Sequence, residues 1–216
     1  FIYNNKKIIE TIKENSVILV ESSTGSCKTV LMPKYTLHAL NYKGNVAVTL
    51  PKKDMTLSSA SFSADTLDVV LGEEVGYQFK GDSKFSNKTK LLYATDGTIV
   101  ARLIKDPKIP ELDAIIIDEG QDFEALWYKT LLLALNRETN SLLIAVDSSQ
   151  SIYNRKVRWK SIGIDIVGRT KVFKKNYRNT KQIGTKRFAK RYNRFIARTS
   201  WYWKNRNGVS ICKGNK

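Results

Sequence analysis

Two short segments hold residues that together could bind a nucleotide and its metal ion. In the first, a turn of small residues follows the apolar run that ends at Val20 and closes on Lys28 and Thr29. Backbone N–H groups of such a turn can surround a phosphate, the lysine can reach the outer phosphates, and the threonine hydroxyl can bind Mg²⁺. In the second, four consecutive apolar residues precede Asp118 and Glu119. This pattern predicts a buried strand with two carboxylates at its end.

The two segments would divide the chemistry of nucleotide hydrolysis between them. Asp118 would hold the metal together with Thr29, and Glu119 would orient and deprotonate the attacking water. The small-residue turn departs from the usual Gly-x-x-x-x-Gly-Lys-Ser/Thr pattern, because Ser22 and Cys27 occupy the two glycine positions. An ordinary Ser/Gly-rich turn and a strand that ends in two solvated acids are the simpler alternatives. The expected nucleotide-binding residues of the turn are Thr24, Gly25, Ser26, Cys27, Lys28 and Thr29.

The elements that would position these groups alternate along the chain. Short apolar runs predict strands at residues 17–20, 45–50, 90–94, 114–118 and 141–146. Longer runs predict helices at residues 28–40, 58–71, 97–104 and 125–136. Strands that alternate with helices and lack a polar face indicate a parallel sheet covered on both sides. We therefore expect an α/β domain.

Charge is distributed unevenly along the 216 residues, whose net charge is +17. Residues 1–150 contain 17 Lys and Arg against 19 Asp and Glu, whereas residues 151–216 contain 20 against one, Asp165. Aromatic residues such as Tyr153 and Trp159 lie within the basic part. Such a region can bind phosphates and stack on bases, which predicts a nucleic-acid partner. A solvated basic segment without a ligand is the alternative.

The remaining composition restricts the class of protein. Cys27 and Cys212 are the two cysteines, and they have neither metal-ligand nor disulfide-framework spacing. The longest apolar runs have four or five residues, well below the ~20 that a membrane span requires. We expect a cytoplasmic protein without membrane contact. Since the chain begins with Phe1, we also expect it to be part of a longer protein.

Several segments resemble the first RecA-like domain of superfamily 2 DEAH/RHA helicases. Residues 22–29 resemble the family's Gly-x-Thr-Gly-Ser-Gly-Lys-Thr loop, and residues 48–53 its Val-Thr-Gln-Pro-Arg-Arg segment. Val-Gly-Tyr at residues 75–77 and Thr-Asp-Gly at residues 95–97 match in order and approximate spacing. The resemblance implies nucleic-acid contacts by seven residues: Thr49, Pro51, Lys52, Lys53, Thr95, Asp96 and Gly97.

From Asp118 onward the sequence resembles superfamily 1 UvrD/Rep-like helicases instead. Residues 118–122 look like their Asp-Glu-x-Gln-Asp, residues 147–153 like their Asp-x-x-Gln-Ser-Ile-Tyr, and residues 176–178 like their Asn-Tyr-Arg. This resemblance implies that Gln121 and Gln150 sense the γ-phosphate and that Tyr177 stacks on the nucleotide base. Arg178 would act as an arginine finger, although it could equally be one cation among many.

These resemblances imply a RecA-like P-loop NTPase whose parallel sheet is flanked by helices. The first RecA-like, ATP-binding domain would span residues 1–168, and the incomplete start of a second would span residues 169–216. The leading hypothesis is an ATP- and Mg²⁺-dependent helicase motor acting on single-stranded DNA or RNA. A nucleic-acid-binding relic weakened by Cys27 and a P-loop NTPase of another type are the alternatives. Protein partners cannot be deduced.

Overall fold

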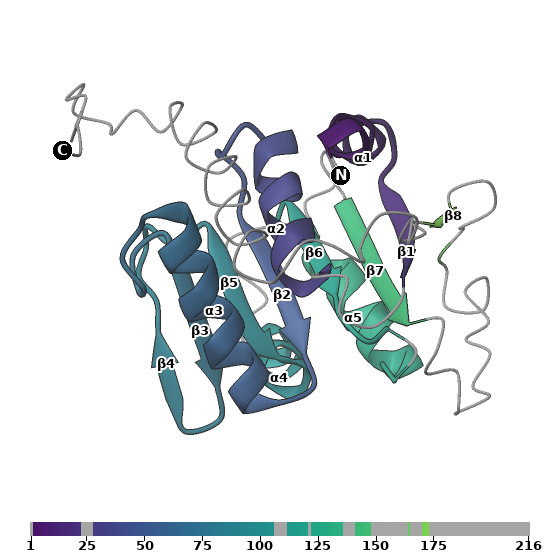
Figure 1. Ribbon diagram of the computed structural model, residues 1–216. Coiled ribbons are helices and arrows are strands. Elements are labelled where there is room, and N and C mark those ends of the chain that lie inside the picture. Colours follow the sequence, from purple (N-terminus) through teal and green to yellow (C-terminus); the bar gives the residue numbers. More distant parts are fainter. Residues whose placement is uncertain are drawn as a thin grey trace, which may run out of the picture.

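One mixed sheet organises the part of the chain that the structure describes (Figure 1). The computed structural model describes residues 2–22, 28–105, 112–120, 122–135, 141–147, 164 and 170–172. Within them the strand order is β4-β3-β5-β2-β6-β7-β1-β8, and every pair is parallel except β3 with β4. The strands are β1 (Val17–Ser22), β2 (Val46–Leu50), β3 (Val75–Phe79), β4 (Asp82–Lys84), β5 (Leu91–Thr95), β6 (Ala114–Ile117), β7 (Ser141–Asp147) and β8 (Thr170–Val172).

Helices cover both faces of this sheet. On one face, α1 (Ile2–Glu14), α2 (Lys28–Ala39) and α3 (Lys53–Leu67) pack on the strands through one hydrophobic cluster. On the other, α4 (Asp96–Lys105) and α5 (Ala125–Ala134) pack through a second cluster. Because the parallel strands all point the same way, the loops that follow them meet at one edge of the sheet.

Strand β6 shows why the central strands are apolar without interruption. Its residues are at most 1% exposed. Ile116 belongs to the cluster under α1, α2 and α3, whereas Ile115 and Ile117 belong to the cluster under α4 and α5. Side chains of a strand alternate between the two faces, so a strand covered on both sides has no polar position. The predicted α/β class is confirmed.

The observed elements follow the predicted ones closely, with a few differences. Helix α3 begins at Lys53 instead of residue 58, although this segment is rich in hydroxyl residues. The Thr56 and Ser58 hydroxyls bond to the carbonyls of Lys52 and Asp54 four residues earlier, which satisfies them inside a helix. The helix ends where Asp68 adopts a left-handed φ of +56°. Helix α1 and strands β3 and β4 were not predicted.

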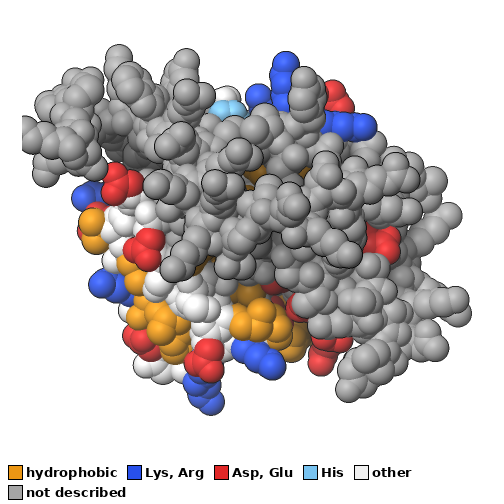
Figure 2. Space-filling view, viewed as in Figure 1, with side chains coloured by type: hydrophobic (Ala, Val, Ile, Leu, Met, Phe, Trp, Pro, Cys, Tyr) orange, Lys and Arg blue, Asp and Glu red, His pale blue; other side chains and the backbone are white. Residues whose placement is uncertain are grey.

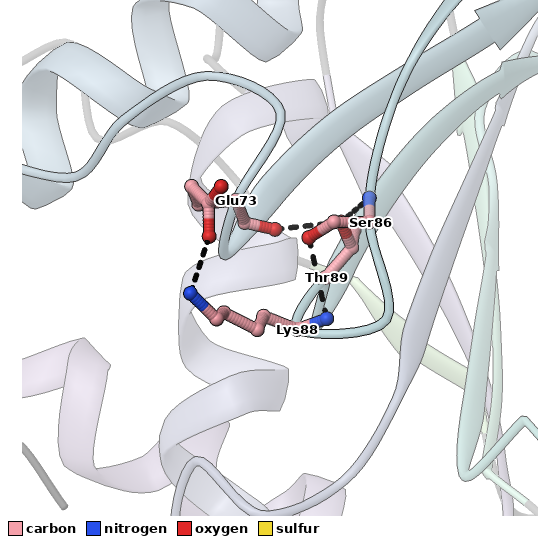
Figure 3. Close-up of polar contacts among 4 residues, drawn as sticks. All are labelled: Glu73, Ser86, Lys88 and Thr89. Carbon is pink, nitrogen blue, oxygen red and sulfur yellow. Dashed lines mark hydrogen bonds and ion pairs between the residues drawn. The ribbon is translucent and has the colours of Figure 1, made fainter.

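Polar contacts fix the loop beyond the edge hairpin β3–β4 (Figure 3). The Thr89 hydroxyl donates to the Glu73 carbonyl at 2.6 Å and accepts the Ser86 N–H at 2.9 Å. Lys88 Nζ lies 3.0 Å from a Glu73 carboxylate oxygen. Both side chains of that ion pair are well exposed, so it adds little stability. The partly buried Thr89 hydroxyl therefore does more than the ion pair to hold this loop in place.

Hydrophobic side chains appear among charged ones on the coloured part of the surface (Figure 2). Phe62 on α3 is 50% exposed and Phe85 is 39% exposed. Cations cover both rings, since Lys34 Nζ lies 5.7 Å from the Phe62 centroid and the Arg102 guanidinium 4.8 Å from that of Phe85.

No helix of the described residues is long and apolar enough to cross a bilayer.

The close approach of β4 to β3 explains the glycine of the Val-Gly-Tyr segment and generates a first prediction. A Cβ on Gly76 would lie 2.7 Å from the Lys84 carbonyl oxygen and 2.7 Å from Phe85 Cβ. Gly76→Ala should therefore lower the free energy of unfolding, measured by urea denaturation, by about 1–3 kcal/mol. Gly97→Ala is the matched control, because its Cβ would meet no described atom within 4 Å and it lies in helix α4. Equal stability of the two variants would contradict this explanation.

Candidate nucleotide and nucleic-acid site

A hydrogen bond joins the two predicted halves of the nucleotide site. The Thr29 hydroxyl, in the first turn of α2, donates to Asp118 Oδ2 at 2.6 Å. Asp118 follows β6 directly and is 3% exposed. The two residues are 89 positions apart in sequence. The fold therefore places a hydroxyl and a carboxylate oxygen at one point, and oxygen ligands of this kind suit Mg²⁺.

Lys28 lies at the same edge of the sheet. Its ammonium nitrogen is 3.5 Å from the Val146 carbonyl oxygen in β7, a long contact for a hydrogen bond. Lys28 is also the first residue of α2, whose N-terminal end favours an anion. The Lys28 ammonium group thus lies beside Thr29 at the start of α2, where it could contact a phosphate.

Two buried tyrosines near this site were not predicted as functional. The Tyr93 hydroxyl shares a 2.7 Å hydrogen bond with Ser63 and lies 3.3 Å from the Thr29 carbonyl. It therefore connects β5 and α3 to the first turn of α2. The Tyr128 hydroxyl donates to the Gly120 carbonyl at 2.8 Å, directly after Glu119. Both tyrosines are 0% exposed. Their bonds go largely to backbone oxygens, which no side-chain pattern in a sequence reveals.

Glu119 occupies an uncommon backbone conformation. Its φ is +53°, in the left-handed region that non-glycine residues rarely adopt. Its carbonyl accepts the Asp122 N–H at 2.9 Å, which closes a tight turn after β6. Strain of this kind persists where neighbouring contacts fix the conformation, and it often occurs at functional sites.

The predicted nucleic-acid contacts lie at the carboxyl ends of β2 and β5, next to Asp118. Pro51, Lys52 and Lys53 are exposed, as is Gly97. Lys53 Nζ lies 5.8 Å from the centroid of the Phe79 ring. In contrast, Thr49 is 0% exposed, and its carbonyl accepts the Asp118 N–H at 3.1 Å. The Thr49 backbone therefore holds the backbone of Asp118 from within the sheet.

Thr95 and Asp96 lie at the carboxyl end of β5, where α4 begins. The Thr95 hydroxyl donates to the Thr98 hydroxyl at 2.8 Å in the first turn of α4. The Asp96 Oδ1 and Thr49 Oγ1 atoms are both buried here. Burial raises the pKa of Asp96 to about 6, and the charges of Asp118 and Asp122 add to the increase while the Thr49 hydroxyl opposes it.

The other predicted site residues lie outside the described part of the chain. They are Thr24, Gly25, Ser26, Cys27, Gln121, Gln150, Tyr177 and Arg178. The proposed division of the chain after residue 168 stays a prediction for the same reason. Strand β8, which begins two residues beyond that point, pairs in parallel with β1.

Comparison with known proteins indicates helicase relatives. No protein-family model matches the chain. A putative ATP-dependent RNA helicase of Acanthamoeba polyphaga mimivirus is 38% identical over 175 residues, which are 75% of this chain and 25% of the relative. The ATP-dependent RNA helicase HrpA of Borreliella burgdorferi is 40% identical over 123 residues, 56% of this chain and 15% of the relative.

The name of a third relative gives its helicase type. The pre-mRNA-splicing factor ATP-dependent RNA helicase DEAH10 of Arabidopsis thaliana is 30% identical over 132 residues, 60% of this chain and 18% of the relative. The chain spans a quarter or less of the length of these three relatives. They are DEAH/RHA-type helicases of superfamily 2, which confirms that part of the resemblance and agrees with a RecA-like fold.

The resemblance to superfamily 1 from Asp118 onward is not supported by these relatives. The motifs that suggested it are three to seven residues long. Matches to motifs this short have a high false-positive rate. Patterns of this length discriminate poorly between helicase lineages.

Asp96 generates a prediction about stability and pH. Its ordinary pKa is 3.8 and its pKa in the folded chain is about 6, so its ionisation costs folding free energy. The cost is absent below pH 3.8, grows between pH 3.8 and 6, and is complete above pH 6. Asp96→Asn should therefore stabilise the chain at pH 8 by up to about 3 kcal/mol, and the gain should vanish near pH 4.

Urea denaturation at both pH values, without nucleotide and in the presence of EDTA, measures this difference. Asp65→Asn is the matched control, since Asp65 is exposed on α3. A gain for Asp96→Asn that is the same at pH 4 and pH 8 would show that its ionisation is not the cause.

Proposed function

We propose that this chain is the ATP-binding motor domain of an ATP-dependent RNA helicase. The observation that carries the proposal is the 2.6 Å hydrogen bond between Thr29 and Asp118, which brings the two halves of a nucleotide site together. The mimivirus, bacterial and plant relatives named as ATP-dependent RNA helicases support the substrate class. ATP hydrolysis would drive movement along, or separation of, RNA strands.

Each described side chain of the site has a definite task in this proposal. Thr29 and Asp118 would hold Mg²⁺, which supplies neutralising charge for the phosphates when it is bound. Lys28 would leave the Val146 carbonyl and contact the outer phosphates. Glu119 would orient the attacking water and accept its proton. Glu119 follows Asp118 in the sequence, so the carboxylate proposed for the water and the one proposed for the metal both lie directly after β6.

RNA would bind along the exposed residues at the ends of β2 and β5. Lys52 and Lys53 offer cations for the phosphate backbone, and Gly97 leaves open space beside the start of α4. Phosphate contacts give affinity without sequence preference, and that affinity falls as salt is raised. Single-stranded RNA affinity that stays constant between low and high salt would contradict this part of the proposal.

The residues outside the described part would complete the site. Residues 24–27 would surround the phosphates, and Gln121 and Gln150 would sense the γ-phosphate. Tyr177 and Arg178, which follow β8 in the chain and which we assign to a second RecA-like domain, would contact the base and stabilise the transition state.

The proposal predicts a specific loss of hydrolysis when Glu119 is changed. In the full-length protein, Glu119→Gln should lower the kcat of RNA-stimulated ATP hydrolysis by about 10²–10⁴-fold, because the amide cannot accept the proton. ATP binding, measured by calorimetry, should remain, since Lys28, Thr29 and Asp118 are intact.

Glu124→Gln is the matched control, because Glu124 is an exposed acid in the same loop. An unchanged kcat for Glu119→Gln would show that Glu119 takes no part in ATP hydrolysis. A wild-type protein that binds RNA but does not hydrolyse ATP would contradict the helicase proposal itself.

A further inference from the structure

A fully buried hydroxyl on α5 binds the carbonyl of Gly120, the residue that follows Glu119. Tyr128 is 0% exposed, and its hydroxyl donates to the Gly120 carbonyl at 2.8 Å. On its other side, the Gly120 N–H donates to the Ala145 carbonyl of β7 at 2.8 Å. Both polar groups of Gly120 are therefore bonded, one to a helix and one to a strand.

The space around Gly120 is equally restricted. A Cβ at this position would lie 2.4 Å from Ile144 Cγ2 and 3.0 Å from the Tyr128 hydroxyl. A branch there would push the turn away from β7 or from α5. A larger residue at this position would therefore require Ile144 or the turn itself to shift.

Glu119 needs such support because of its backbone. A φ of +53° is unfavourable for a side chain with a Cβ, by about 1 kcal/mol or more. A turn under this strain relaxes unless its neighbours hold it. The Gly120 N–H bond to Ala145 holds the peptide joined to Glu119, and the Gly120 carbonyl bond to Tyr128 holds the other side of the same residue. The two bonds together restrict how far the Glu119 side chain can turn.

The Tyr128 hydroxyl can donate its hydrogen bond throughout the physiological pH range. Burial raises the pKa of its hydroxyl, and the negative charge of Asp96 raises it further. The hydroxyl therefore stays protonated across the physiological pH range and donates to the carbonyl. The Phe123 ring lies edge-on to the Tyr128 ring, with centroids 4.9 Å apart, which fixes the tyrosine ring from the side.

We propose that Tyr128 is a positioning residue for ATP hydrolysis, which acts by holding the Glu119 carboxylate in its productive direction. This inference rests on the proposed function. A general base must lie within hydrogen-bond reach of the water it activates, and small displacements of a catalytic group reduce the rate substantially. Loss of the hydroxyl would allow the strained turn to relax and Glu119 to turn away.

Replacing Tyr128 by Phe in the full-length protein tests the inference, because only the hydroxyl is removed. The kcat of RNA-stimulated ATP hydrolysis should fall about 3- to 10-fold, as expected for one hydrogen bond, with the Kd for ATP unchanged. Tyr77→Phe is the matched control. Tyr77 is 7% exposed and its hydroxyl donates to Asp82 at 2.9 Å in the edge hairpin, away from the turn after β6. Its kcat should equal that of the wild type.

A double-mutant cycle separates positioning from general destabilisation. If Tyr128 acts through Glu119, Tyr128→Phe should not lower the residual kcat of Glu119→Gln any further. A structural role would lower kcat by the same factor in both backgrounds, and that result would overturn the inference. An unchanged kcat for Tyr128→Phe alone would overturn it as well. A wild-type protein without ATPase activity would instead refute the proposed function, and the inference with it.

Discussion

The hydrogen bond between Thr29 and Asp118 is the constraint on which the rest of the account depends. It exists because β1 and β6 run parallel on either side of β7, so that the segments following them emerge at the same edge of the sheet. A buried carboxylate needs a polar partner, and the helix that follows β1 provides one. The sheet order therefore decides whether the Thr29 hydroxyl and the Asp118 carboxylate can meet at all.

The same sheet connects the nucleotide site with the proposed RNA surface. Strand β2 lies next to β6, and the Thr49 carbonyl accepts the Asp118 N–H. Two residues after Thr49 the chain reaches the surface at Pro51 and turns into α3. A displacement of this segment would thus act on a strand that is bonded directly to the backbone of Asp118. The segment at Pro51 and Asp118 lie close together because they follow β2 and β6, which are neighbouring parallel strands.

The sequence predicted the buried strands well because burial on both faces leaves a continuous apolar run, as in Ala114–Ile117. It also predicted that Thr29 and Asp118 share a site, since strand ends of a parallel sheet meet. The edge strand Asp82–Lys84 was missed because its residues are all exposed and polar. Tyr128 was missed because its partner is a backbone carbonyl, and apolar helices commonly contain buried tyrosines. Tertiary contacts of this kind leave no periodic signal.

The location of the metal tests the central claim most directly. Crystals of the protein grown with Mn²⁺ in place of Mg²⁺ and a non-hydrolysable ATP analogue would show the ion by its anomalous scattering. If Thr29 and Asp118 bind the metal together, one anomalous peak will lie within coordination distance of both Thr29 Oγ1 and an Asp118 carboxylate oxygen, at about 2.0–2.3 Å. A peak that contacts the nucleotide but neither of these two side chains would contradict it.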